Sequence, residues 1–289
     1  MNSSLADNFP AGYAPDKVWS PKTDHGGQFA SINRAESGAR FEQALPAGKH
    51  PLQLYSQGTP NGQKVTILLE ELLAAGHTGA EYDAWLIDIF KGDQFGSGFV
   101  AINPNSKIPA LVDRTTDPVT RVFESGSILV HLAEKFGAFL PASGPARTET
   151  FNWLMWQMGA APFVGGGLGH FYGYAPIKIE YAIDRYAMET KRQLHVLDTH
   201  LASHEFLAGD EYTIADMAVW PWYPGSLYNV YHTHEFLAVE QYTHLLRWYN
   251  AIAVRPAVAR GRVVNRVNGA PGECLRERHD AVDFESMNR

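Results

Sequence analysis

Hydrophobic and polar positions alternate along residues 51–56, and this period of two predicts a β-strand. Turn-forming residues follow at 58–62. Over residues 63–75 the hydrophobic positions recur every three or four residues, which predicts a helix that ends at Gly76. Residues 81–89 form a second strand candidate. The pattern therefore predicts a strand–helix–strand unit.

Two short apolar runs, 110–113 and 121–123, flank turn-prone residues and predict a β-hairpin. Helical spacing returns over 125–136. A parallel βαβ unit followed by an antiparallel ββα unit makes an α/β sandwich. This order matches a thioredoxin-like domain, which we place at residues 49–140.

Strand patterns disappear after residues 141–145, whose Pro, Ala, Ser and Gly are typical of a linker. Dense apolar positions at helical spacing predict helices over 147–158, 177–203, 214–223 and 241–254. We therefore expect a second, all-α domain over residues 146–256.

Two further segments, 1–48 and 257–289, flank these domains. The N-terminal segment is rich in Gly, Pro, Ser, Asn and Asp, which by itself favours a disordered leader. Its apolar side chains instead predict an ordered arm that lies on the body, anchored by Trp19, Phe29, Ile32 and Phe41. In the C-terminal extension, arginines at 260–266 predict a solvated or dimer-packing surface, and residues 272–278 predict a surface tail.

Composition excludes a wholly disordered chain, because 45% of the 289 residues are hydrophobic and 12% are aromatic. The formal net charge of −7 gives no electrostatic reason to expect nucleic acid or an anionic membrane as a partner. No apolar run has the roughly 18 residues of a membrane span, and residues 1–10 lack a secretory signal pattern. We therefore expect a cytoplasmic protein.

The chain has one cysteine, Cys274, near its C-terminus. A single thiol excludes an intramolecular disulfide, an all-cysteine zinc site and a CxxC redox pair. If the protein performs thiol chemistry, the thiol must come from another molecule.

Thr59, Pro60 and Asn61 stand at the junction between the first strand and the first helix. Threonine is a good N-cap and proline is favoured at the first helical position, so the start of a helix alone explains Thr59 and Pro60. The same place also offers free N–H donors and a partial positive charge, which stabilise a thiolate. Thr59 and Asn61 could each donate a hydrogen bond to such a sulfur.

Pro109, in the run Ser106–Leu111, precedes the first strand of the hairpin, where it removes a ladder donor. One interpretation is an ordinary edge-strand proline. If the Ile108–Pro109 peptide is cis, the backbone of Ile108 turns outward and can pair with an extended peptide. The sequence leaves the isomer open.

Glu124 and Ser125 precede the helix predicted at 125–136. Ser125 can simply cap this helix. The pair can also bind the two charged ends of an amino acid: the carboxylate takes the helix N–H groups and the serine hydroxyl, and Glu124 takes the ammonium.

Together, TPN after the first strand, SKIPAL before the hairpin and ESGSI after it resemble the glutathione-binding site of glutathione transferases. The helical half adds the run GDEYTIADM, in which Thr213 and Asp216 predict a capping box with Tyr212 as a staple. The resemblance covers about residues 49–225. It implies the glutathione transferase fold, a thioredoxin-like domain followed by an all-α domain.

Three features resemble the nu class of bacterial enzymes, relatives of the C-terminal domain of the yeast nitrogen-regulating prion protein. They are Asn61 after Pro60, the arm segment 29–34 and the glycine-rich segment 165–171. This resemblance implies a homodimer that reduces disulfide bonds with glutathione as cosubstrate. Weak glutathione transferase and peroxidase activities are implied as well.

The resemblance also implies that the first glutathione contacts Thr59, Pro60, Asn61, Gln94, Lys107, Ile108, Pro109, Glu124 and Ser125, with Thr59 and Asn61 catalytic. It implies a second glutathione held by Asn33 and Arg185. Met158 departs from the class, which has glutamine there, and this departure affects a contact of the second site. Gln157 replaces that contact only if the helix turns.

Several other residues receive a structural interpretation. Tyr55, where other transferase classes place a thiol-activating tyrosine, is expected to be a packed aromatic. His200 and His204 share a helix face but lack a third metal ligand, so we expect no metal site. The glycines at 165–169 lack a phosphate-loop lysine and predict a flexible segment, with substrate-pocket lining by Phe171, Tyr172 and Tyr174.

Two other functions remain open beside disulfide reduction. One is a transferase that conjugates glutathione to small electrophiles. The other is a non-catalytic glutathione-fold module that acts through partners. The relative rates on a disulfide and on an electrophile distinguish the three.

Overall fold

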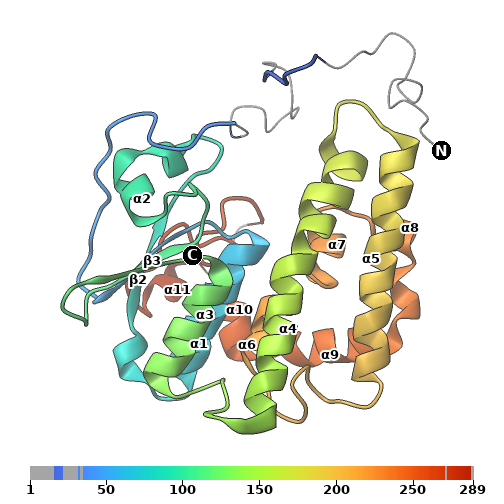
Figure 1. Cartoon of the computed structure of the whole chain (residues 1–289). Coiled ribbons are helices and arrows are strands. Elements are labelled where there is room, and N and C mark those ends of the chain that lie inside the picture. Colours follow the sequence, from blue (N-terminus) through green and yellow to red (C-terminus); the bar gives the residue numbers. More distant parts are fainter. Residues whose placement is uncertain (1–15, 22–31, 33–34, 271, 288–289) are drawn as a thin grey trace.

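A four-stranded sheet occupies one side of the molecule in the computed structural model, which describes residues 16–21, 32, 35–270 and 272–287 (Figure 1). Its order is β2-β1-β3-β4, with β1 parallel to β2 and antiparallel to β3. The strands are β1 (Leu52–Ser56), β2 (Tyr82–Leu86), β3 (Ala110–Asp113) and β4 (Thr120–Phe123). The predicted thioredoxin-like arrangement is confirmed.

Helices cover both faces of this sheet. On one face, Leu54 and Leu111 belong to the same core cluster as α1 (Pro60–Ala74) and α3 (Ser125–Phe136). On the other face, Tyr55 and Ala110 pack with Phe99 of α2 (Ser97–Ile102). The sequence did not predict α2, because this helix is short and buries only one large side chain.

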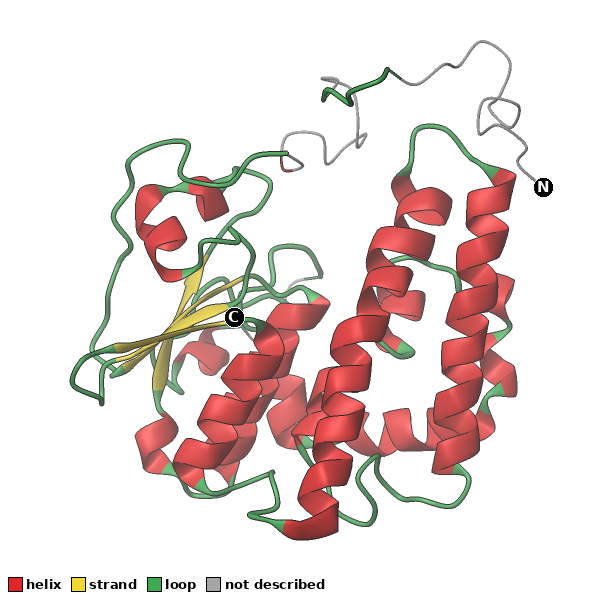
Figure 2. Cartoon of the chain, in the orientation of Figure 1, coloured by secondary structure: helices red, strands yellow, loops and turns green. Residues whose placement is uncertain are grey.

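All other helices follow the sheet in sequence, and strands are absent from the described part of this half (Figure 2). Here α4 continues without a break into a π-helix over Phe163–Tyr174. The remaining helices and their bounds are α4 (Gly144–Pro162), α5 (Glu180–Leu201), α6 (Ile214–Val219), α7 (Gly225–Asn229), α8 (His234–Leu237), α9 (Thr243–Ala253), α10 (Pro256–Gly261) and α11 (Asp283–Ser286). The predicted all-α half is confirmed.

The prediction of a flexible segment at the glycines of residues 165–169 is wrong, because residues 163–174 are helical. The glycines instead give aromatic rings room to pack. A Cβ on Gly165 would lie 2.9 Å from the Trp222 ring, and one on Gly167 would lie 2.3 Å from the Tyr186 ring. Close ring packing therefore selects glycine here.

The predicted capping box at α6 is present. The Thr213 hydroxyl accepts a hydrogen bond from the Ala215 N–H, and Asp216 accepts one from the Thr213 N–H at 2.9 Å. Asp216 also accepts bonds from Leu207 N–H and from the Trp248 indole. This buried carboxylate therefore joins α6 to α9 and to the preceding loop.

The C-terminal extension is not the surface tail that the sequence predicts. Arg278 pairs with Ala84 on edge strand β2, whose N–H donates to the Arg278 carbonyl at 2.7 Å. The Arg278 side chain is only 1% exposed and forms ion pairs with Glu70 and Glu81. These acidic partners, of which Glu70 is buried and Glu81 half-buried, draw the extension onto the sheet together with the otherwise unpaired edge of β2.

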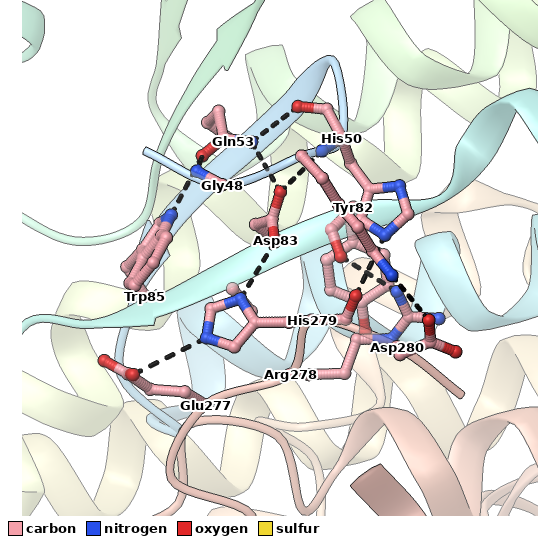
Figure 3. Close-up of polar contacts among 12 residues, drawn as sticks. Gly48, His50, Gln53, Tyr82, Asp83, Trp85, Glu277, Arg278, His279 and Asp280 are labelled. Carbon is pink, nitrogen blue, oxygen red and sulfur yellow. Dashed lines mark hydrogen bonds and ion pairs between the residues drawn. The ribbon is translucent and has the colours of Figure 1, made fainter. Parts of the chain in front are cut away.

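Polar side chains bind residues 279–280 of this extension to the sheet domain (Figure 3). The His279 imidazole bonds the buried Asp83 carboxylate at 2.9 Å. The same carboxylate accepts bonds from the backbone N–H of His50 and from the Gln53 amide. Lys49 forms an exposed ion pair with Asp280. The extension is thus held to β2 and to residues 49–50, which precede β1.

The arginines at 260, 262 and 266 are half-buried rather than fully solvated. Arg260 forms an ion pair with Glu70 on α1 at 2.8 Å. Gly261 is buried so closely against Ile67 that a Cβ would lie 2.6 Å from its backbone. This segment therefore covers α1.

Part of the N-terminal arm lies outside the described residues, Phe29 among it. Trp19 and Phe41 are 63% and 43% exposed, so neither is the buried anchor that the sequence predicts. The arm contacts the body through its backbone, where the Ser97 N–H donates to the Phe41 carbonyl at 2.9 Å. It also contacts the body through side chains, where the Arg40 guanidinium lies 3.8 Å from the centre of the Phe95 ring. Among the helices described, none is long and apolar enough to cross a membrane.

Candidate functional site

A cavity of about 300 Å³ opens where the N-termini of α1 and α3 face the loop before β3. Seven residues implied by the family resemblance line it, namely Asn61, Gln94, Lys107, Ile108, Pro109, Glu124 and Ser125. The other lining residues are Ile32, Ile89, Asn105 and Ser106. The fold thus brings three separate sequence motifs to one place.

The N-terminus of α1 provides one wall. Thr59 is its N-cap, and the Thr59 hydroxyl oxygen accepts a hydrogen bond from the Gly62 N–H at 3.3 Å. Pro60 occupies the first turn. Capping is therefore confirmed, whereas Thr59 and Pro60 are not among the described residues that line the cavity. Asn61 follows, and its side-chain oxygen accepts a bond from the Trp222 indole at 3.0 Å.

The loop before β3 provides a second wall, and its Ile108–Pro109 peptide is cis. Buried Asn103 holds the shape of the loop. Its amide donates to the Lys107 carbonyl at 2.6 Å, and its side-chain oxygen accepts from the Asn105 N–H at 2.9 Å. Asn103 lies three residues before the run Ser106–Leu111, and its structural role was not predicted.

Glu124 and Ser125 provide the third wall. Glu124 is exposed and has a φ of 71°, a left-handed conformation that is costly for a residue other than glycine. Ser125 does not cap α3, because no side-chain cap bond is formed there. Its hydroxyl instead accepts a bond from the Lys64 ammonium at 3.3 Å.

Lys64 is a functional candidate that sequence reasoning missed. It is 1% exposed, and its ammonium also donates to the Gln157 side-chain oxygen at 2.6 Å. Burial lowers the pKa of Lys64 well below its usual value, and the charge of Glu124 opposes this effect. Lys64 stands four residues before Leu68, and residues four apart share one helix face. This spacing was the available signal that Lys64 lies on the buried face of α1.

Gln94 forms part of the cavity floor. Its amide donates to the Ile89 carbonyl at 3.3 Å. Its buried side-chain oxygen has no partner among the described residues. A donor on a ligand in the cavity would satisfy this oxygen, because buried acceptors are rarely left unpaired.

Of the two residues implied for a second glutathione, only Arg185 belongs to the described part of the chain. Arg185 is exposed on α5, outside the cavity lining, and Asn33 lies outside the described residues. Met158 packs against α3, where a Cβ on Gly126 would lie 2.9 Å from its sulfur. Gln157 is buried and bonded to Lys64, so it does not take over a ligand contact.

The aromatic residues predicted to line a substrate pocket lie on the π-helix, away from this cavity lining. Phe171 stacks on Tyr186 with ring centroids 5.6 Å apart. Tyr172 stacks on Phe236 at 4.6 Å, and Tyr174 meets the His170 ring edge-on.

The structural interpretation of Tyr55 is confirmed, because its ring is buried and its hydroxyl donates to the Pro46 carbonyl at 2.7 Å. Burial raises its pKa, which opposes formation of a tyrosinate. His200 and His204 stack on each other, and the described residues contain no cluster of three metal-ligating side chains. Cys274 does not line the cavity.

Family models and known proteins match this chain. The model of the glutathione S-transferase N-terminal domain matches residues 50–134, and the model of the C-terminal domain matches residues 180–251. The disulfide-bond oxidoreductase YghU of Escherichia coli is 66% identical over 275 residues, covering 95% of this chain and 96% of that protein.

Two solved structures are similar. Glutathione transferase YghU from Streptococcus pneumoniae, complexed with glutathione, has a TM-score of 0.85 and 55% identity, covering 86% of this chain and 97% of its own. A glutathione transferase family member from Pseudomonas fluorescens with two glutathione bound has a TM-score of 0.70 and 38% identity, covering 75% of this chain and 95% of its own. The similarity extends almost from end to end, beyond the residues 49–225 that carry the motifs, and the chain belongs to the glutathione S-transferase family.

Proposed function

We propose that this enzyme reduces disulfide bonds with glutathione bound in the cavity between α1, α3 and the loop before β3. The observation that carries the proposal is the position of Asn61, a neutral donor at a helix N-terminus in a cavity whose described lining contains no cysteine. A reducing thiol must then come from the ligand. The name and the bound glutathione of the similar proteins support the same chemistry.

The three walls suit the parts of glutathione, a tripeptide with a γ-linked glutamate. Ser125 and the N-terminus of α3 offer donors to the glutamyl carboxylate, and the Glu124 carboxylate faces its ammonium. The backbone of Ile108 pairs with the cysteinyl residue. Gln94 and Lys107 complete the polar lining. The cysteinyl sulfur then faces the start of α1.

The start of α1 favours a thiolate there. A free thiol has a pKa of about 8.5 and is mostly protonated at neutral pH. The helix N-terminus and hydrogen bonds from Thr59 and Asn61 stabilise the anion and lower this pKa. A larger thiolate fraction accelerates attack on a disulfide.

The reaction consumes two glutathiones. The first thiolate attacks one sulfur of the disulfide R–S–S–R′, which forms the mixed disulfide G–S–S–R and releases R′–S⁻. A second glutathione thiolate attacks the glutathionyl sulfur, which forms glutathione disulfide and releases R–S⁻. Two protons from the glutathiones neutralise the two product thiolates. Asn33 and Arg185 are our proposed contacts for the second glutathione, and Phe171, Tyr172 and Tyr174 for the disulfide.

Activity measurements test this proposal. The purified protein is assayed with 2-hydroxyethyl disulfide and with chlorodinitrobenzene in the presence of glutathione. We expect disulfide reduction to dominate, with weak conjugation and peroxidase activity. Dominant conjugation without disulfide reduction would identify a transferase of small electrophiles, and binding without turnover would identify a non-catalytic module.

Substitution of Asn61 tests the mechanism. Asn61→Ala removes a donor from the sulfur and is expected to lower kcat/KM for disulfide reduction by roughly 10- to 100-fold. Cys274→Ser is the control and is expected to retain wild-type activity. Loss of activity in the Cys274 variant would place the reacting thiol in the protein instead.

We propose further that the enzyme is a homodimer and works in the cytoplasm, where glutathione is kept reduced. The homodimer rests on the resemblance to the nu class. Light scattering of the purified protein measures its mass directly. A monomeric mass at micromolar concentration would contradict the dimer.

A further inference from the structure

The indole of Trp222 reaches from the helical half to the side chain of Asn61 at the start of α1. The indole nitrogen lies 3.0 Å from the Asn61 side-chain oxygen, and the residue is 8% exposed. An indole N–H can only donate a hydrogen bond. The atom of the Asn61 amide that faces Trp222 must therefore be its oxygen.

Fixing the oxygen also fixes the other end of the amide. The Asn61 NH₂ group has no acceptor among the described residues, and Asn61 lines the cavity. An amide that rotates freely presents either its NH₂ group or its oxygen to a ligand. Only the NH₂ group stabilises an anion, because the oxygen carries partial negative charge.

We propose that Trp222 is a positioning residue, which holds the Asn61 amide so that its NH₂ group faces the glutathione sulfur. This inference rests on the proposed function and deepens it. Trp222 does not touch the reacting atoms in this account; it acts by excluding the amide orientation that would place an oxygen against the thiolate.

The glycine-rich π-helix makes room for this indole. A Cβ on Gly165 would lie 2.9 Å from Trp222 Cη2 and 3.1 Å from Cζ3, both atoms of the rigid ring. Any larger side chain at Gly165 would therefore displace the indole from its place behind Asn61. The glycine that the sequence analysis assigned to a flexible segment thus supports the orientation of a cavity residue.

Trp222→Phe tests the inference, because it removes the N–H donor and keeps an aromatic ring. The readout is the pKa of enzyme-bound glutathione, titrated by the ultraviolet absorbance of the thiolate, together with kcat/KM for 2-hydroxyethyl disulfide. We expect the thiol pKa to move toward the free value of about 8.5. We expect kcat/KM at neutral pH to fall about 5- to 10-fold.

Trp220→Phe is the matched control. Trp220 also donates one indole bond, but to the Tyr249 carbonyl at 3.0 Å, which is not part of the cavity lining, whereas Trp222 donates to the lining residue Asn61. We expect this variant to leave the pKa of the bound thiol unchanged. Thermal unfolding of both variants identifies any loss of the fold before the kinetic comparison.

A double substitution separates positioning from packing. In an Asn61→Ala background there is no amide to orient, so Trp222→Phe is expected to change kcat/KM by less than about twofold. An equal loss in both backgrounds, or an unchanged thiol pKa in Trp222→Phe alone, would overturn the inference. Wild-type protein that fails to lower the pKa of glutathione would instead contradict the proposed function.

Discussion

A buried ammonium without a carboxylate partner is costly, and burial accordingly lowers the pKa of Lys64, which lies directly behind the cavity. Its neighbours are the neutral oxygens of Ser125 and Gln157, and the described residues place no carboxylate in ion-pair distance of it. A ligand carboxylate that binds at Ser125 would supply the missing negative charge. We therefore expect Lys64 to favour an anionic ligand at Ser125.

Lys64→Met should therefore weaken glutathione binding while the fold persists. We expect the Kd measured by calorimetry to rise roughly tenfold, the magnitude of one charge-assisted hydrogen bond. The affinity of γ-aminobutyryl-cysteinyl-glycine, which lacks the glutamyl carboxylate, should change little. Lys191→Met is the control, since that ammonium donates to the Leu237 carbonyl instead. Equal losses for both ligands would contradict a role for Lys64 toward the carboxylate.

Residues of the cavity differ in how far the sequence could identify them. Thr59, Asn61 and Ser125 stand at helix starts, where local capping rules and a helix dipole already indicate anion binding. Lys64 and Trp222 act through partners 93 and 161 residues away, so local periodicity carries no signal of these contacts. Their roles required the packed structure.

At the scale of elements, Asp113 ties the end of β3 to α3. This buried carboxylate accepts bonds from the Thr115 N–H at 2.9 Å and from the His131 ring at 2.9 Å, and it pairs with the Lys135 ammonium at 3.0 Å. Burial opposes the ionised form of Asp113. The hydrogen bonds outweigh burial and hold its pKa at about 2, below the ordinary 3.8.

The sign of this shift fixes a pH dependence. Between about pH 4 and pH 2 the unfolded chain binds a proton at Asp113 and the folded chain does not, so stability falls as the pH falls. We expect Asp113→Asn to cost at most about 2 kcal/mol at pH 7 and progressively less toward pH 3. Urea unfolding at several pH values measures this loss of unfolding free energy, and Asp117→Asn in the exposed turn is the control. A constant cost at every pH would refute the linkage.

Most elements followed from periodicity because amphipathic helices and alternating strands bury one face. The exceptions have physical causes. Six-residue α2 is too short to show a period. In the π-helix, glycines replace the apolar positions that mark a helix, because rings from other elements fill their places.

At the scale of the whole molecule, the C-terminal extension joins parts that are distant in sequence. The Asn265 carbonyl accepts a bond from the Gly58 N–H at 2.7 Å, immediately before the α1 cap. Arg278 then pairs with β2 and with Glu70 on α1. Composition predicted a surface tail, because its charged residues find their partners only once the sheet and α1 have formed.

Arg278→Ala tests how much the molecule depends on this extension. The substitution leaves Glu70 buried without this ion-pair partner and removes the donor to the Tyr82 carbonyl. We expect the free energy of unfolding, measured in urea, to fall by about 3 kcal/mol. Arg276→Ala, an exposed arginine two residues earlier, should change it by less than about 0.5 kcal/mol. A loss for Arg278→Ala as small as that of Arg276→Ala would mean that the buried ion pairs of Arg278 contribute nothing to the stability of the fold.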